Sequence, residues 1–110
     1  MAIRRIVKEG DPILRMKCRP VTEFGEKLNQ LLDDMHETLE QANGVGLAAP
    51  QVGYCRRFFI MHLGDVKIEA INPEIKKTSG KQYVLEGCLS VPNKWGYVTR
   101  PNKCKFRAQN

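Results

Sequence analysis

An apolar stripe between residues 24 and 42 constrains the fold more than any other feature of this 110-residue sequence. The apolar residues recur mostly at spacings of three and four, which places them on one face of an α-helix. Thr22 is a suitable N-cap for this helix, and Asn43-Gly44 is a suitable stop. One face of the helix must therefore be buried against another element. The stripe comprises Phe24, Leu28, Leu31, Leu32, Met35, Leu39 and Ala42.

Short strands are predicted after this helix. Apolar runs at 57–63 and 66–71 flank the turn signal Gly64-Asp65, so they predict a hairpin, which Asn72-Pro73 is expected to end. Further strands are predicted at 81–85, 96–99 and 103–109, and a short helical turn is predicted after Asp11-Pro12. One long N-terminal amphipathic helix packed on short strands indicates an α+β class with an antiparallel or mixed sheet. We treat residues 1–110 as a single domain.

The composition indicates a soluble globular chain. Hydrophobic residues make up 42% and charged residues 27%. No apolar run approaches the roughly 18 residues that a membrane span needs, and the N-terminus lacks a secretion signal, so a cytoplasmic location is expected. The net charge of +6 is scattered, which favours an ordinary solvated surface over a DNA or membrane partner, although it is compatible with the ribosome.

Four cysteines are present, and none forms a C-x-x-C pair. Because no secretion signal is visible, a disulfide framework is not expected. The spacing does not support a zinc site made of all four thiols either. We expect most of them to be small core residues or residues without a functional role. They are Cys18, Cys55, Cys88 and Cys104.

Two segments differ from ordinary core and loop sequence. The first, G-V-G-L-A-A-P-Q-V-G at 44–53, is small and apolar, with Gln51 as its only polar side chain. Glycines allow a positive φ or the close approach of a ligand to the backbone. From these residues alone, a helix stop followed by a tight buried turn is favoured. A G-x-G pair with no strand before it does not indicate a dinucleotide site.

The second segment is E-G-C-L-S-V-P at 86–92, which places Cys88 among turn-forming residues. A thiol there could serve as a nucleophile or as a metal ligand, and a buried structural cysteine is the competing interpretation. A nucleophile would need a histidine base. No spacing places His36 or His62 beside Cys88, and His36 is expected at the edge of the helix stripe or in solvent.

Taken together, the two segments resemble the G-x-G-L-A-A-x-Q and E-G-C-L-S motifs of the peptide deformylase family. Gly10-Asp11-Pro12, Ile71-Asn72-Pro73 and Arg100-Pro101 are similar to family positions as well, so the resemblance covers essentially the whole chain. It implies a peptide-deformylase-like fold. It also implies metal-dependent removal of the formyl group from N-formylmethionyl nascent peptides.

The resemblance also implies roles at the catalytic centre. Cys88 holds the position of a ligand to a catalytic divalent metal, Fe²⁺ or alternatively Zn²⁺ or Ni²⁺. Gln51 and the backbone N–H of Leu89 hold the positions that stabilise the oxyanion formed from the formyl group. Gly46 would contact the substrate main chain.

Other positions would shape the peptide site. The resemblance implies that Val45 and Val84 line the pocket for the methionine side chain. Glu86 lies among the substrate-binding positions and would form a structural ion pair with Arg100.

One family motif, H-E-x-x-H, does not occur in these 110 residues. Its two histidines and its glutamate complete the metal site and supply the acid/base group. One thiolate does not hold a catalytic metal, because three protein ligands plus water are usual. We therefore expect the chain to be a truncated family member that is inactive alone. We also expect that it binds no metal by itself.

Other interpretations remain open. A separate chain could complete the site in trans, or the chain could be a non-catalytic module that binds peptides or the ribosome. A cysteine hydrolase with Cys88 as nucleophile is the weakest alternative, because no histidine partner can be argued. An uncovered sheet face around Leu89 and Phe106 is expected to favour homo-oligomers.

Overall fold

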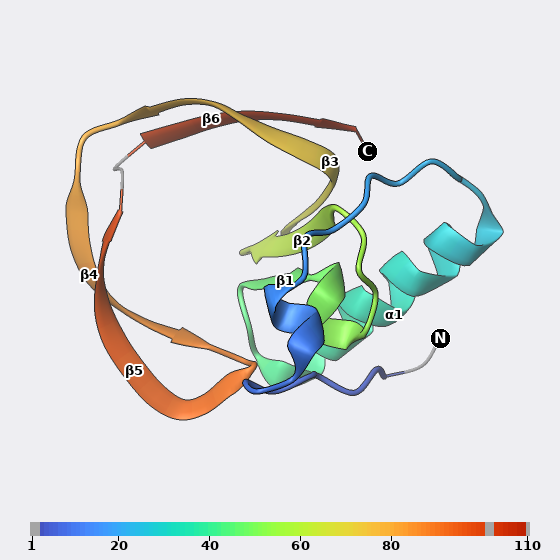
Figure 1. The fold of residues 1–110 in the computed structure, drawn as a ribbon, viewed down its shortest axis with the longest axis horizontal. Coiled ribbons are helices and arrows are strands. Elements are labelled where there is room, and N and C mark those ends of the chain that lie inside the picture. Colours follow the sequence, from blue (N-terminus) through green and yellow to red (C-terminus); the bar gives the residue numbers. More distant parts are fainter. Residues whose placement is uncertain (1–2, 101–102, 110) are drawn as a thin grey trace.

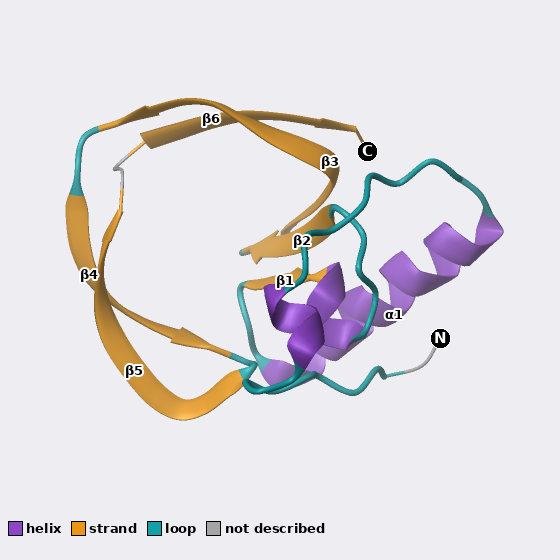
Figure 2. Cartoon of the chain, viewed as in Figure 1, coloured by secondary structure: helices purple, strands orange, loops and turns teal. Residues whose placement is uncertain are grey.

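The computed structural model describes residues 3–100 and 103–109. Within these ranges the α+β class is confirmed, and the paired strands are antiparallel. The helical elements gather beside β1 and β2, and the β4–β5 hairpin extends away from them (Figures 1 and 2). The elements in chain order are η1 Pro12–Arg15, α1 Glu26–Ala42, β1 Gly46–Ala48, η2 Ala49–Val52, β2 Phe58–Leu63, β3 Val66–Ser79, β4 Gln82–Cys88, β5 Val91–Arg100 and β6 Lys103–Gln109.

The α1 helix is shorter at its start than predicted. Its N-cap is Gly25 in extended backbone, so the prediction of Thr22 is wrong, and Phe24 lies outside the helix with 53% of its surface exposed. Glu26 occupies the first turn, where a carboxylate is favoured by the helix dipole. The predicted stop is confirmed, because Asn43 adopts a left-handed conformation with φ 56° and caps the last turn.

The predicted hairpin at Gly64-Asp65 is confirmed, but the strand after it does not end at Asn72-Pro73. β3 continues to Ser79 and changes partner on the way. It pairs with β2 from Val66 to Ile71 and with β6 from Ile71 to Ser79, with a register shift in the second ladder between Ile71 and Glu74. Asn72 has a positive φ of 54°, and Pro73, which has no N–H to donate, lies at the register shift of the β3–β6 ladder. The break predicted from the sequence is therefore a bend within one strand.

The main sheet has the order β1-β2-β3-β6, and β4-β5 forms a separate two-stranded sheet. Both strands of the β4–β5 hairpin are longer than predicted. A two-residue turn, Leu89-Ser90, joins them, since Cys88 pairs with Val91. In Figure 1 this hairpin is a long curved ribbon whose turn comes back to the helical part of the molecule.

The core lies between α1 and the sheet. Four predicted stripe residues of α1, Leu31, Leu32, Met35 and Leu39, are buried there. No helix among the described residues is long and apolar enough to cross a membrane. The sheet and loop residues of the core are Val21, Leu47, Ala49, Val52, Phe58, Ile60 and Ile71.

Candidate functional site

The first motif forms a short strand and a 3₁₀ turn instead of the tight turn favoured from its residues alone. Gly46 and Leu47 belong to β1, which pairs with β2 at the edge of the main sheet. Gln51 lies in η2, which follows at once. The periodicity of a three-residue strand is too short to be recognised in a sequence, so this element was missed.

The side-chain amide of Gln51 has a fixed orientation. Its Oε1 accepts a hydrogen bond from the backbone N–H of Ala48 at 3.0 Å. Its Nε2 consequently faces the β4–β5 turn, where it donates to Ser90 Oγ at 3.1 Å and lies 3.7 Å from Cys88 Sγ. The backbone carbonyl of Gln51 also accepts from the Val7 N–H at 2.6 Å. An amide held at both ends loses little rotamer entropy when it binds a ligand.

The second motif supplies the other wall of the site. Cys88 ends β4 and is exposed, whereas Ser90 in the turn is only 3% exposed. Ser90 was not among the predicted site residues, although it lies two positions after Cys88 in the same motif. It joins the motifs, because it accepts from Gln51 and its carbonyl accepts from the Glu9 N–H at 2.8 Å.

Leu89 anchors the turn on the core. Its side chain is partly buried against the core cluster, so Leu89 itself is not part of an exposed apolar face. Phe106 belongs to the same prediction, and its side chain is not among those that the structure describes. A Cβ on Gly44 would lie 2.7 Å from Leu39 Cδ1 and 2.9 Å from Leu89 Cδ1, so this glycine makes room for the anchor. Lys8 Nζ donates to the Leu89 carbonyl at 3.1 Å.

A pocket of about 630 Å³ lies where the two motifs meet. Val45, which is 63% exposed, lines it together with Gly46, Gln51, Cys88 and Leu89. Its volume falls in the range of small-ligand sites. Sequence reasoning missed other lining residues, which include Ile6 and Lys8 from the distant N-terminal segment and Lys94 and Trp95 from β5.

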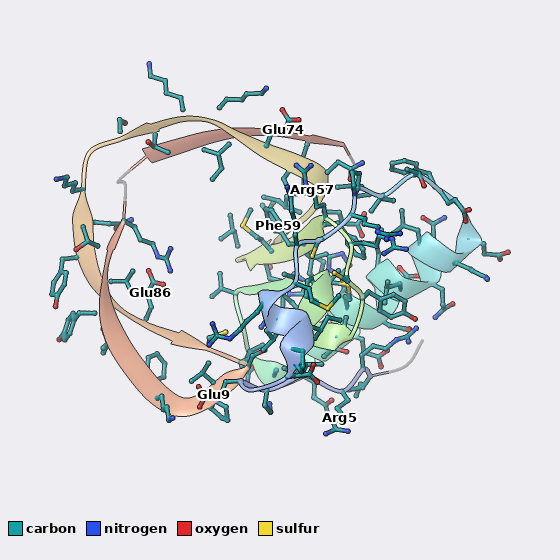
Figure 3. All side chains as sticks on the ribbon, viewed as in Figure 1. Arg5, Glu9, Arg57, Phe59, Glu74 and Glu86 are labelled. Atoms are coloured by element: carbon teal, nitrogen blue, oxygen red, sulfur yellow. The ribbon has the colours of Figure 1, made fainter. Side chains whose placement is uncertain are left out.

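The other predicted substrate positions lie on the hairpin. The side chain of Val84 is outside the described part of the structure. Glu86 receives two hydrogen bonds from Arg100, at 2.5 and 2.8 Å. These hydrogen bonds lower the pKa of Glu86 and raise that of Arg100. Figure 3 shows Glu86 on the inner side of the curved ribbon.

The two histidines are bound to each other instead of to Cys88. His36 Nδ1 lies 2.8 Å from His62 Nε2, and His36 Nε2 lies 2.8 Å from Glu69 Oε2. His36 is thus at the edge of the stripe and half-buried, and the alternative of a solvent position is wrong. Sequence spacing did not show this contact, because it joins α1 to β2 and β3.

The described residues do not form a complete metal site. No group of three or more His, Cys, Asp and Glu side chains in this part of the chain is arranged to hold a metal ion. Cys88 presents a sulfur atom to the pocket, while His36 and His62 contact each other elsewhere. A metal ion held at Cys88 would need further ligands.

Fold and pocket together define an α+β protein with a ligand pocket in which an exposed thiol and an oriented amide donor face the same space. Comparisons with known proteins identify the family of the chain. The family model described as polypeptide deformylase matches residues 3–110. The chain belongs to the polypeptide deformylase family.

Similar proteins carry the same name. The chain is 50% identical to a peptide deformylase of Caldicellulosiruptor bescii over 110 residues, covering 100% of this chain and 66% of the relative. It is 55% identical to one from Agathobacter rectalis over 107 residues, covering 97% and 68%. The crystal structure of peptide deformylase from Thermotoga maritima matches with a TM-score of 0.97 and 41% identity, covering 100% and 76%. The chain thus spans about two thirds to three quarters of their lengths.

Proposed function

We propose that this chain carries the oxyanion-stabilising half of a peptide deformylase site, which removes the formyl group from N-formylmethionyl peptides once the remaining metal ligands are supplied. The fixed orientation of the Gln51 amide is the observation that carries this proposal. It presents a donor beside the Cys88 thiol, where charge would develop on a carbonyl oxygen.

Gln51 and Leu89 would act on that oxygen together. The Gln51 Nε2 is held within reach of Cys88 Sγ, and Leu89 occupies the first central position of the turn between Cys88 and Val91. The hydrogen bond across such a turn uses the N–H of its last residue, which leaves the Leu89 N–H for a ligand. Removal of one preorganised donor typically costs about 10²–10³ in kcat.

The substrate backbone would lie along β1. This strand is at one end of the described sheet, and Gly46 and Val45 line the pocket beside it. An extended peptide commonly adds to such an edge through main-chain hydrogen bonds. Gly46 would contact the peptide backbone, and Val45 with Val84 would contact the methionine side chain. Glu86, paired with Arg100, would stiffen the hairpin beside them.

A divalent ion, Fe²⁺ or alternatively Zn²⁺ or Ni²⁺, would supply Lewis acidity and a water molecule of lowered pKa. Among the residues of this chain, Cys88 would hold it. Because the sequence contains no H-E-x-x-H, we propose that the 110 residues are inactive until such a segment is provided by further chain or in trans. The activity belongs in the cytoplasm, on nascent peptides at or near the ribosome.

The test is deformylase turnover of the 110-residue chain on a formyl-Met peptide, loaded anaerobically with Fe²⁺ or Ni²⁺. We expect no turnover alone, turnover after addition of a helix that carries H-E-x-x-H, and none with Cys88→Ala. Turnover by the chain alone that Cys88→Ala abolishes would contradict the proposed incompleteness. Turnover that needs Cys88 but no metal would indicate the cysteine hydrolase.

The same experiment addresses the non-catalytic alternative. If the added helix restores no turnover while the chain still binds the peptide, a peptide- or ribosome-binding module explains the pocket better. Light scattering of the same samples shows whether the exposed aromatic face of the hairpin makes the chain a homo-oligomer. That face includes Tyr83, Leu85, Trp95 and Tyr97.

A further inference from the structure

Two cysteines outside the pocket lie side by side. The Sγ atoms of Cys18 and Cys55 are 3.9 Å apart, and both side chains are half-buried. Cys18 precedes α1, and Cys55 follows η2. We propose that Cys18 and Cys55 are a redox modification site, at which a peroxide oxidant forms a reversible disulfide that fastens these two loops together.

The backbone is already arranged for this bond. Arg19 and Arg56, the next residue in each segment, form a parallel bridge. The Arg57 N–H donates to the Arg19 carbonyl at 2.9 Å, and the Arg19 N–H donates to the Cys55 carbonyl at 3.5 Å. Neighbouring extended segments lie about 4.8 Å apart, which is inside the range of roughly 4.4–6.8 Å that a disulfide requires between Cα atoms.

Only the side chains need to move. A disulfide bond is about 2.05 Å long, so the sulfur atoms at 3.9 Å must approach by about 2 Å. Rotation about the Cα–Cβ bonds supplies this movement, since the bridge keeps both residues on the same side of the backbone pair. Cys88 and the pocket are not part of this contact, so the pair is separate from the proposed catalytic thiol.

The two sulfurs have different surroundings. Burial raises the pKa of the Cys18 thiol, contact with Cys55 raises it further, and the charges of Arg56 and Arg57 oppose both effects. The Cys55 thiol also lies 3.6 Å from the Lys17 carbonyl oxygen. Either sulfur of the pair can begin the reaction.

The oxidation takes two electrons from the two thiols. One thiol of the pair gives up its proton and its sulfur attacks hydrogen peroxide, so that an S–O bond forms, the O–O bond breaks and the departing hydroxide takes that proton to become water. The sulfur of the other cysteine then attacks the sulfenic acid. The S–S bond forms, the S–O bond breaks, and the hydroxide leaves as a second water with the proton of the second thiol. A small thiol reverses the reaction by exchange.

The disulfide would close a loop that contains α1, β1 and Gln51. The two cysteines are separated by 37 positions, and closing a loop of this size should raise Tm by roughly 10 °C in a chain of this length. In a reducing cytoplasm the bond would be transient. It would therefore protect the fold during oxidative conditions instead of serving as a permanent framework.

The test treats the folded chain with hydrogen peroxide, blocks free thiols with iodoacetamide before unfolding, and maps tryptic peptides by mass spectrometry. Cleavage at Lys27 and Arg56 separates peptide 18–27 from peptide 28–56, so the disulfide appears as these two peptides joined. We expect this species to be abundant and to disappear on reduction. Cys18→Ser and Cys55→Ser should each abolish it together with the Tm rise, whereas Cys104→Ser and Cys88→Ser should retain both.

Two results would overturn the proposal. The first is that peroxide oxidises Cys88 while Cys18 and Cys55 are both recovered as alkylated thiols. The other is a set of linked peptides that join Cys88 or Cys104 to either thiol in comparable yield, because that would indicate random pairing instead of a preformed site.

Discussion

The part of the molecule built on α1, β1 and β2 differs sharply from the β4–β5 hairpin. Met35, Leu39 and Ile60 are fully buried in the first region, whereas Trp95 in the second is 71% exposed. Gln51 belongs to the packed region and Cys88 to the hairpin. The pocket is therefore assembled from a rigid half and a weakly supported half, which the turn at Ser90 joins.

The largest expected difference between the regions is in stability. Leu39→Ala should lower the free energy of unfolding by about 3 kcal/mol, because it leaves a cavity in the core. Trp95→Ala, which removes a larger side chain from the hairpin, should lower it by less than about 1 kcal/mol. Urea unfolding of both variants measures this directly. Equal losses would mean that the hairpin is as well packed as the core.

A smaller effect is expected where the two regions meet. Gly44→Ala places a Cβ against the side chains of Leu39 and Leu89, so it should cost about 1–3 kcal/mol and displace the turn that carries Cys88. Gly96→Ala in β5 is the matched control, because a Cβ there meets nothing within 4 Å. Thermal unfolding of the Gly44→Ala and Gly96→Ala variants measures this difference. Equal Tm values for the two variants would show that Leu89 does not anchor the hairpin.

The packed region should also show a pH dependence near neutral pH, where the carboxylate of the hairpin ion pair does not titrate. Burial lowers the pKa of His62, and the charges of His36 and Lys67 lower it further while Glu40 opposes them. Glu69 faces the same pair through His36. The folded state therefore binds fewer protons, so stability is complete above about pH 6.5 and declines as the pH falls below it.

His62→Gln is the variant that tests this dependence. Urea titrations between pH 7.5 and 5.5 should show a smaller decline for the variant than for the unchanged chain. If both chains lose stability in parallel, the decline belongs to other groups.

The smallest effect is expected at the ion pair of the hairpin. Glu86 and Arg100 are both accessible to water, and exposed pairs contribute little to stability. Arg100→Ala should leave Tm within error, yet hydrogen exchange of β4 and β5 should become faster. A clear fall in Tm would show that the hairpin and the core unfold together.

The parts that the sequence predicted well depend on local periodicity. The apolar face of α1 and the stop at Asn43 need only neighbouring residues, and both are found. Pro73 misled the prediction because β3 finds a second partner in β6, which lies about thirty residues away along the chain. The start of α1 was misplaced by a local ambiguity. Thr22 and Gly25 are close together and both suit the N-cap position, and the structure uses Gly25.

The candidate site divides in the same way. The two motifs predicted Gln51, Cys88 and Leu89 as site residues, because each motif is a run of consecutive residues that resembles a family motif. Lys8 and Trp95 enter the pocket through the return of the N-terminal segment and of β5, so neither motif includes them. Ser90 lies within the second motif, and only its hydrogen bond with Gln51 in the structure shows its role. The contact between Cys18 and Cys55 depends in the same way on a parallel bridge between distant loops.

The most direct test of the assembled pocket is the turnover of Gln51→Glu in the enzyme completed with an H-E-x-x-H segment. The glutamate keeps an oxygen to accept from the Ala48 N–H but removes the donor that faces Cys88. We predict a fall in kcat of at least about 10²-fold with little change in KM and in Tm. An unchanged kcat would contradict the claim that the packed half of the molecule stabilises the oxyanion at the thiol of the hairpin half.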